Sequence, residues 1–161
     1  MEQRVHWLVV LATVLVALAL AIVPLPGLLS TLRPDWVALV MIYWMLTNPG
    51  RFSMLSALFL GLLLDTMSGS LLGQHALAML VVAYFTQSFA LRIRVFPLMQ
   101  MSLTVLVLVI VYQFFLFWID GITGRQVALI DRWAPAITAA FIWPLLLASL
   151  DGLRRETQTR M

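Results

Sequence analysis

The sequence contains no cysteine and few charged residues. Without cysteine, disulfides, cysteine-ligated metal sites and thiol nucleophiles are all excluded. Only 11% of the 161 residues are charged, whereas 63% are hydrophobic, far above the roughly 45–50% apolar content of soluble domains. A soluble fold of this length has no interior large enough for so much apolar surface. The composition therefore predicts an all-α integral membrane protein that uses lipid as its solvent.

The sequence also lacks the short motifs of energy-coupled chemistry. It has no phosphate-binding glycine loop, dinucleotide fingerprint or zinc pattern, so we expect no cofactor. A net charge of +3 suggests nucleic-acid binding in a soluble protein, but here the arginines lie in short clusters beside hydrophobic runs. We interpret them as topology signals and expect membrane lipid, not nucleic acid, around the chain.

Hydrophobic segments predict a single transmembrane domain over residues 1–161 with six spans. The first segment resembles a secretory signal, but its apolar run of about 17 residues exceeds the usual core of roughly 7–15. No soluble domain follows it, so we expect a retained span. The six predicted spans are about 7–23, 36–47, 52–67, 71–91, 97–119 and 133–150.

The second predicted span, 36–47, is too short to cross a membrane alone. A helix of about 12 residues covers roughly 18 Å of a hydrocarbon layer near 30 Å thick. Spans 36–47 and 52–67 could form a re-entrant hairpin, or two full crossings whose ends extend through protein-lined space. We prefer six crossings, because a re-entrant hairpin would move Arg33 to the side of Arg51.

The distribution of arginine predicts the orientation of the six spans. Seven arginines fall on the side of the two termini and three on the other side, which places both termini in the cytoplasm. The seven are Arg4, Arg51, Arg92, Arg94, Arg154, Arg155 and Arg160, and the three are Arg33, Arg125 and Arg132.

Asp65 is the most unusual residue of the sequence, a lone carboxylate set between two long apolar runs. A carboxylate at membrane depth costs at least a few kcal/mol and usually faces a polar partner. We expect it to be bonded to Arg33, to His75 or to the backbone of residues 68–70. An architectural contact is the favoured role, and binding of a partner or substrate is the alternative.

The small residues that precede Asp65 predict a close helix contact. Ser53, Ala57 and Gly61 lie on the same helical face as Asp65, at four-residue spacing. Such a stripe lets a neighbouring helix approach closely.

His75 and the nearby serines suggest two kinds of chemistry that we consider and disfavour. Metal ligation needs more donors than one histidine and Asp65. Ser68 or Ser70 could form a nucleophilic set with Asp65 and His75, but a triad is defined by geometry, which proximity in sequence does not supply. We expect a hydrogen-bonded interior histidine.

Several segments together resemble one family, the bacterial rod shape-determining protein MreD. The resemblance extends from about Trp7 to Arg155, and its most specific part runs from Gly61 to Gly73. The segments that carry it are Arg33-Pro34-Asp35-Trp36, Tyr43-Trp44, Gly61-Leu62-Leu63-Leu64-Asp65, Ser68-Gly69-Ser70-Leu71-Leu72-Gly73 and Trp143-Pro144.

The resemblance implies a non-enzymatic subunit of the machinery for lateral cell-wall elongation, in the bacterial inner membrane. Such proteins bind the scaffold protein MreC and work with MreB, RodA and the elongation-specific transpeptidase in peptidoglycan synthesis. The family is also thought to share a six-helix fold with the S components of energy-coupling-factor transporters. No catalytic, cofactor or metal residues carry over. The structural or interaction candidates are Arg33, Asp35, Gly61, Asp65, Gly69, Gly73 and His75.

A substrate-binding S component of a vitamin transporter is the alternative function. In that case the small residues Thr13, Ala17 and Ala21 would dock the first span on an energising partner. The short outer loops, which offer few polar groups to orient a ligand, argue against it.

Overall fold

The computed structural model describes residues 7–50 and 52–159. In this part of the chain all regular structure is helical, and α2 is a single turn of four residues. The helices are α1 (Trp7–Ile22), α2 (Leu28–Thr31), α3 (Trp36–Thr47), α4 (Met54–Ser68), α5 (Gln74–Ile93), α6 (Leu98–Thr123) and α7 (Leu129–Thr159).

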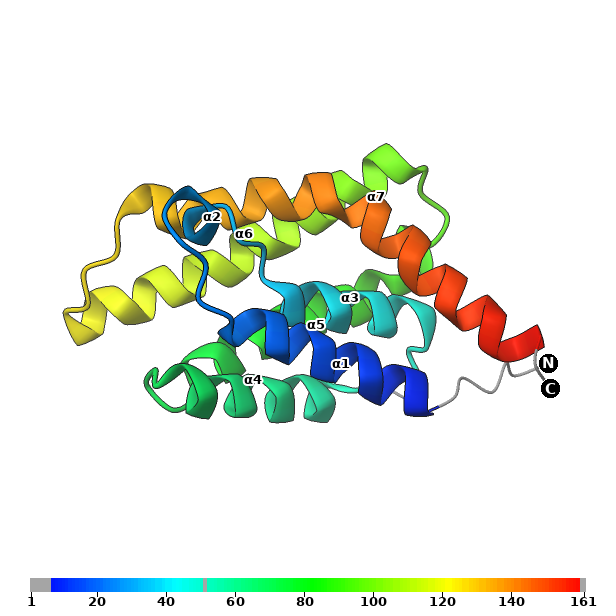
Figure 1. The fold of residues 1–161 in the computed structure, drawn as a ribbon, viewed down its shortest axis with the longest axis horizontal. Helices are drawn as coiled ribbons and strands as arrows, with labels where there is room; N and C mark the ends of the chain where they lie inside the picture. Colours follow the sequence, from blue (N-terminus) through cyan, green and yellow to red (C-terminus); the bar gives the residue numbers. More distant parts are fainter. Residues whose placement is uncertain (1–6, 51, 160–161) are drawn as a thin grey trace.

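The long helices run side by side, and their ends define two ends of the molecule (Figure 1). At one end, on the right in Figure 1, α1 begins and α7 finishes; we call it the terminal end. The other end, which we call the opposite end, holds α2, the junction of α4 with α5 and the connection from α6 to α7. Arg4, Arg51 and Arg160, which the topology prediction used, lie outside the described residues.

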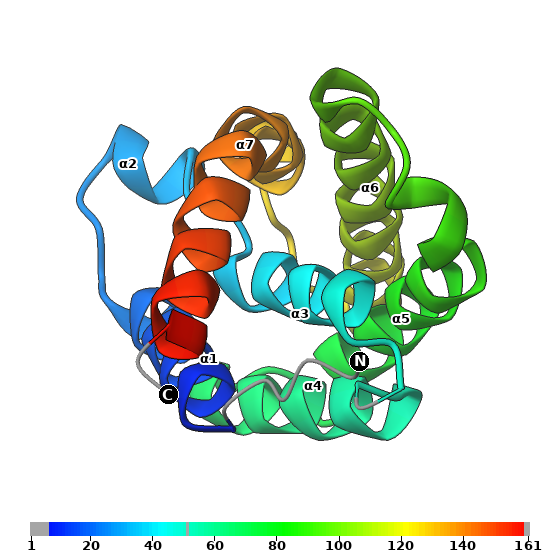
Figure 2. The same cartoon turned by 90° about the vertical axis from the view of Figure 1, so that its right-hand side faces the viewer.

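Helix α3 lies at the centre of the bundle, surrounded by the others (Figure 2). Every residue from Val37 to Leu46 is buried. A helix enclosed by protein does not need to match the thickness of the lipid, so the length of α3, 12 residues, is compatible with a position inside the bundle. α4 packs mainly against α5 and runs back towards the opposite end (Figure 1).

The small-residue stripe of α1 is used inside the molecule. Thr13 and Ala17 are buried, and α1 packs mainly on α3. The indole Nε1 of Trp44 donates a hydrogen bond of 3.0 Å to the hydroxyl of Thr13. The close approach predicted for this stripe is therefore made to a helix of the same chain.

Three helices are long and apolar enough to cross a membrane, namely α5, α6 and residues 129–155 of α7. Each of the other three predicted spans also corresponds to a helix, namely α1, α3 and α4, and the crossing of these helices stays a prediction. The predicted polar connection between residues 119 and 133 is wrong at both ends, because α6 continues to Thr123 and α7 begins at Leu129. Two of the charged residues between positions 119 and 133, Asp120 and Arg132, lie inside the helices and pair with each other, whereas Arg125 lies in the connection itself.

Candidate functional site: two polar clusters at the opposite end

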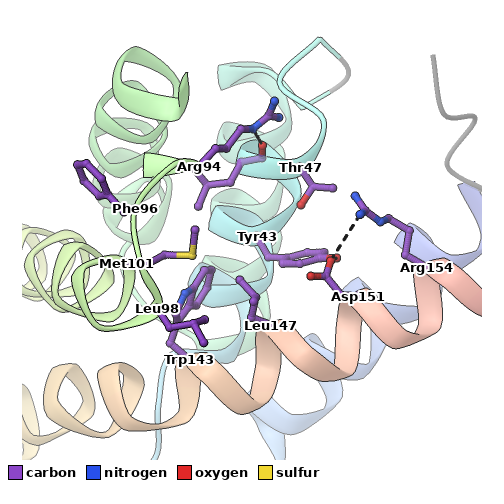
Figure 3. Close-up of a pocket in the computed structure, with 11 residues that line it drawn as sticks. Tyr43, Thr47, Arg94, Phe96, Leu98, Met101, Trp143, Leu147, Asp151 and Arg154 are labelled. Carbon is purple, nitrogen blue, oxygen red and sulfur yellow. Dashed lines mark hydrogen bonds and ion pairs between the residues drawn. The ribbon is translucent and has the colours of Figure 1, made fainter. Parts of the chain in front are cut away.

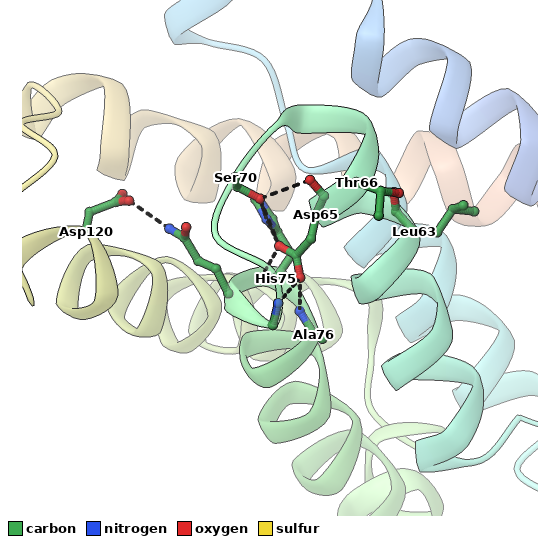
Figure 4. A network of polar contacts seen from close by, with 9 residues as sticks. Leu63, Asp65, Thr66, Ser70, His75, Ala76 and Asp120 are labelled. Atoms are coloured by element: carbon green, nitrogen blue, oxygen red, sulfur yellow. Dashed lines mark hydrogen bonds and ion pairs between the residues drawn. The ribbon is translucent and has the colours of Figure 1, made fainter. Parts of the chain in front are cut away.

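The carboxylate of Asp65 caps the first turn of α5 (Figure 4). Its Oδ2 accepts hydrogen bonds from the backbone N–H groups of Gly73, at 2.8 Å, and Ala76, at 3.4 Å. Its Oδ1 accepts the backbone N–H of His75 at 2.8 Å. The first N–H groups of a helix have no partner within it, and the N-cap Gly73 has no side chain to supply one. Asp65, only 1% exposed, supplies that partner from the end of α4.

Two side chains complete the α5 cap, the cluster formed by Asp65, Ser70, Gly73, His75 and Ala76. Ser70 donates its hydroxyl to Asp65 Oδ1 at 2.9 Å, and His75 Nδ1 lies 2.8 Å from the same oxygen. Negative charge is favoured at a helix N-terminus because of the aligned peptide dipoles. Of the partners predicted for Asp65, His75 is therefore confirmed.

The backbone of the α4–α5 connection depends on glycine at two positions. Gly69, the C-cap of α4, has a φ of 61°, and Gly73 has a φ of 100°. Residues with a Cβ rarely adopt this left-handed region, whereas glycine does so at no steric cost. The connection can therefore turn sharply enough to bring the start of α5 against Asp65.

Gly61 sets how closely α4 and α5 approach. A Cβ at this position would lie 2.3 Å from Ala76 Cα and 2.6 Å from Ala76 N, much closer than atoms can pack. Ala57, one turn earlier, is completely buried. The predicted small-residue face of α4 thus packs against α5, in agreement with the sequence analysis.

Ser70, His75 and Asp65 lie together but do not have the geometry of a nucleophilic triad. In a triad the serine hydroxyl and the carboxylate contact opposite nitrogens of the imidazole ring. Here Ser70 Oγ, at 3.1 Å, and Asp65 Oδ1, at 2.8 Å, both contact Nδ1 of His75. This arrangement holds the ring in place and lacks the relay from carboxylate through both ring nitrogens to serine that defines a triad.

A second polar cluster joins four helices at the same end, and we call it the interhelix network. The buried residues Asp120 of α6 and Arg132 of α7 form an ion pair. Asp120 Oδ1 also accepts a hydrogen bond of 2.8 Å from Gln74 Nε2, at the start of α5. Gln113 of α6 accepts from Arg132 at 3.4 Å and donates to Asp35, the residue before α3.

Arg33, the other predicted partner of Asp65, makes a different contact. It donates a hydrogen bond of 3.0 Å to the carbonyl of Val23, so its predicted pairing with Asp65 is wrong. Arg33 nevertheless lines a cavity of about 230 Å³ together with Asp35, His75 and Tyr112. The structure thus brings Arg33, Asp35 and His75 to one cavity, beside the α5 cap.

Sequence reasoning missed the pairing of Asp120 with Arg132 because both were assigned to the polar connection between the predicted spans 97–119 and 133–150. A signal for their pairing was present in their spacing. Asp120 lies six residues before position 126 and Arg132 six residues after it, since 126 − 120 and 132 − 126 are both 6. In two antiparallel helices joined by a connection centred there, such residues lie opposite each other. Gln113 also hydrogen-bonds across helices.

The residues that the structure describes contain no group of three or more histidine, cysteine, aspartate or glutamate side chains placed to hold a metal ion. The two clusters instead place their acids against backbone N–H groups, amides and a guanidinium. These contacts hold five helices in fixed register at the opposite end of the molecule, namely α3, α4, α5, α6 and α7.

Comparison with known proteins identifies the family. The model of the family described as "rod shape-determining protein MreD" matches residues 1–150. The rod shape-determining protein MreD of Haemophilus influenzae is 27% identical over 153 residues, which cover 95% of this chain and 94% of that protein. No solved structure matches the chain. Since the family model covers nearly the whole sequence, the chain belongs to the MreD family of membrane proteins that determine rod shape.

Proposed function

We propose that this protein is a non-enzymatic, multi-pass subunit of the cell-elongation complex in the bacterial inner membrane. It binds MreC and supports peptidoglycan synthesis together with MreB, RodA and the elongation-specific transpeptidase. Membership of the MreD family supports this proposal, because the family is named for rod-shape determination. The protein acts by holding partners in place.

The observation that carries a docking role is the use made of the buried acids. Asp65 caps α5, and Asp120 is bonded to Arg132 and Gln74. Each of these carboxylates is committed to a structural contact, whereas a catalytic acid needs access to a substrate atom. We therefore propose that Gly61, Asp65, Gly69, Gly73 and His75 shape the bundle on which partners dock.

Arg33 and Asp35 are proposed to extend this structural role to the entrance of α3. Arg33 ties the segment before α3 to the carbonyl that follows α1, and Asp35 ties it to α6 through Gln113. Both contacts fix where the central helix begins.

The proposed topology has six crossings in a single transmembrane domain, with both ends of the chain in the cytoplasm. The arrangement of the described helices supports it, since α1 begins and α7 ends at the same end (Figure 1). The loop and tail arginines support it too. Among the arginines of residues 7–50 and 52–159, four belong to the terminal end. Arg33 and Arg125 belong to the opposite end, and Arg132 is buried and paired with Asp120. The four are Arg92, Arg94, Arg154 and Arg155.

Site-specific photo-crosslinking in cells tests the docking role. A photoreactive residue is placed at the exposed positions Leu8, Leu11 or Leu15 of α1, and at the buried positions Met41 and Ile42 of α3 as matched controls. We expect MreC to be captured from exposed positions and not from the controls. If no exposed position on any helix captures MreC, and the purified protein does not retain it, the proposed partner is wrong.

A vitamin-binding S component remains the second candidate because of one observation. The cavity beside the α5 cap is lined by Arg33, Asp35 and His75, groups able to orient a small polar ligand. Its volume of about 230 Å³ is below the roughly 300–1,000 Å³ of typical ligand pockets. A vitamin identified by mass spectrometry in the purified protein would favour this function over the first.

A further inference from the structure

A larger cavity lies at the terminal end, away from both polar clusters. It has a volume of about 470 Å³ and is bounded by the end of α3, the connection from α5 to α6 and the second half of α7 (Figure 3). Its polar lining is contributed by Tyr43, Thr47, Arg94, Trp143, Asp151 and Arg154. This volume lies within the range of typical ligand sites.

The indole of Trp143 carries a buried donor without a partner. Trp143 lines the cavity and is completely buried, yet its Nε1–H has no hydrogen-bond partner among the described residues. Leaving such a donor unsatisfied is unfavourable, and each such group in a native structure calls for an explanation. A ligand with an acceptor oxygen inside the cavity would satisfy it.

The charges around the cavity favour an anion. Asp151 accepts a hydrogen bond of 2.7 Å from the hydroxyl of Tyr43 and lies 3.8 Å from Arg154. Arg94 donates its Nε–H to the carbonyl of Leu46, and no carboxylate in residues 7–50 and 52–155 is paired with it. Two arginines against one aspartate leave a net charge of +1 at the cavity. Guanidinium groups bind phosphate well because their donors match its oxygens.

The remaining wall of the cavity is apolar. Phe96, Leu98, Met101 and Leu147 line it, and Leu98 is 56% exposed. An occupant must therefore offer an anionic group to Arg94, an acceptor oxygen to Trp143 and hydrocarbon to these side chains. A free phosphate offers only the first two, whereas a phospholipid offers a phosphate, ester carbonyls and acyl chains.

We propose that this cavity binds the headgroup of an anionic phospholipid, with its phosphate at Arg94, an ester carbonyl at Trp143 and its chains along the apolar wall. Basic pockets between transmembrane helices on the cytoplasmic side are a known mode of lipid headgroup binding. The site stands on its own geometry. Only its assignment to the cytoplasmic leaflet depends on the proposed orientation.

Lipid titration of the purified full-length chain, followed by native mass spectrometry, tests the site. The probes are phosphatidylglycerol, zwitterionic phosphatidylcholine and soluble sn-glycerol 3-phosphate. The variants are Arg94→Gln, Trp143→Phe, which keeps an aromatic ring, and Arg92→Gln. Arg92 is a matched control because it is exposed in the last turn of α5, two residues before Arg94, and does not line the cavity.

Both lipids offer a phosphate to Arg94, but phosphatidylcholine adds a cation that the net positive charge of the cavity repels. We therefore expect the wild-type chain to bind phosphatidylglycerol about tenfold more tightly than phosphatidylcholine. Arg94→Gln should abolish this preference and Trp143→Phe should weaken binding of both lipids about threefold, whereas Arg92→Gln should change neither. Elution profile and circular dichroism identify any variant that fails to fold. If Arg94→Gln does not fold, the binding of both lipids by Trp143→Phe decides whether the cavity is the site.

Three results would overturn the proposal. An equal loss in Arg92→Gln and Arg94→Gln would indicate diffuse attraction to surface charge. Saturation by sn-glycerol 3-phosphate would assign the cavity to a soluble phosphate compound, and unchanged binding in both cavity variants would place the lipid elsewhere.

Discussion

The two polar clusters at the opposite end differ in what their acids are bonded to. In the α5 cap, Asp65 accepts from backbone N–H groups within eleven residues of it in sequence. In the interhelix network, the carboxylate of Asp120 accepts hydrogen bonds from two side chains, those of Arg132 and Gln74, which lie 12 and 46 residues away. A backbone donor is removed only by substitution with proline, whereas side-chain partners can be replaced together. The cap should therefore tolerate no substitution of its acid, and the network should tolerate replacement as a unit.

Removing the acid of the cap should have the largest effect. In Asp65→Leu three backbone N–H groups at the start of α5 lose their acceptor, so we expect a loss of about 4 kcal/mol in the free energy of unfolding, at about 1–3 kcal/mol per unsatisfied group. Unfolding in mixed detergent micelles, followed by circular dichroism, measures it. Thr66→Val, at the exposed next position of α4, is the control and should lose little. Equal losses of stability in Asp65→Leu and Thr66→Val would show that the carboxylate of Asp65 does not stabilise the fold more than a neighbouring exposed side chain.

Breaking the ion pair of the network should have an effect close to that of Asp65→Leu, and a matched double replacement should reverse most of it. Arg132→Met leaves a buried Asp120 without its cation, which typically costs about 3–5 kcal/mol, whereas replacing both partners with apolar residues is often nearly neutral. We expect Asp120→Leu combined with Arg132→Met to be more stable than Arg132→Met alone. A double variant whose loss equals the sum of the single losses would show that the two side chains do not act as a pair.

Closing the space at Gly61 should have an intermediate effect on the helix contact that supports the cap. The added Cβ of Gly61→Ala would meet Ala76 backbone atoms at 2.3 and 2.6 Å, and overpacking of this kind costs about 1–3 kcal/mol. Gly121→Ala is the control, because its Cβ meets nothing within 4 Å inside α6, and it should stabilise by about 0.5–1 kcal/mol. The same unfolding measurement decides, and a stable Gly61→Ala variant would contradict the close approach.

Removing the hydroxyl of the cap should have the smallest effect. In Ser70→Ala, Asp65 keeps its backbone donors and the His75 ring, so we expect a loss of about 1 kcal/mol and normal rod shape. Cell morphology and unfolding are measured on the same variant. Loss of rod shape at wild-type stability would indicate a chemical role for this serine that the ring geometry argues against.

Much of the fold was predictable because the positions of the helices follow from the positions and lengths of the hydrophobic segments. The predicted span 36–47 coincides with α3, and the small residues before Asp65 were correctly placed on a packing face. The last span was predicted as 133–150, whereas α7 covers Leu129–Thr159. The predicted span begins too late because Arg132 is charged and was therefore placed outside the membrane, whereas it is buried and paired with Asp120.

The two clusters differ in predictability for the same reason that they differ in chemistry. The partners of Asp65 are close in sequence, so His75 could be proposed, although the role of the backbone N–H groups could not. The contact between Asp35 and Gln113 joins residues 78 positions apart, and no local pattern relates them. Contacts of this length depend on how the helices assemble, which periodicity does not determine.

The central claim is that these polar residues act by holding the bundle in shape. Its most direct test plots cell aspect ratio against the amount of folded protein in the membrane, for cells that express only Asp65→Leu, Arg132→Met, Gly61→Ala or Ser70→Ala. We predict that all four variants fall on the single curve obtained by lowering wild-type expression. A variant present at wild-type abundance in round cells would contradict the claim.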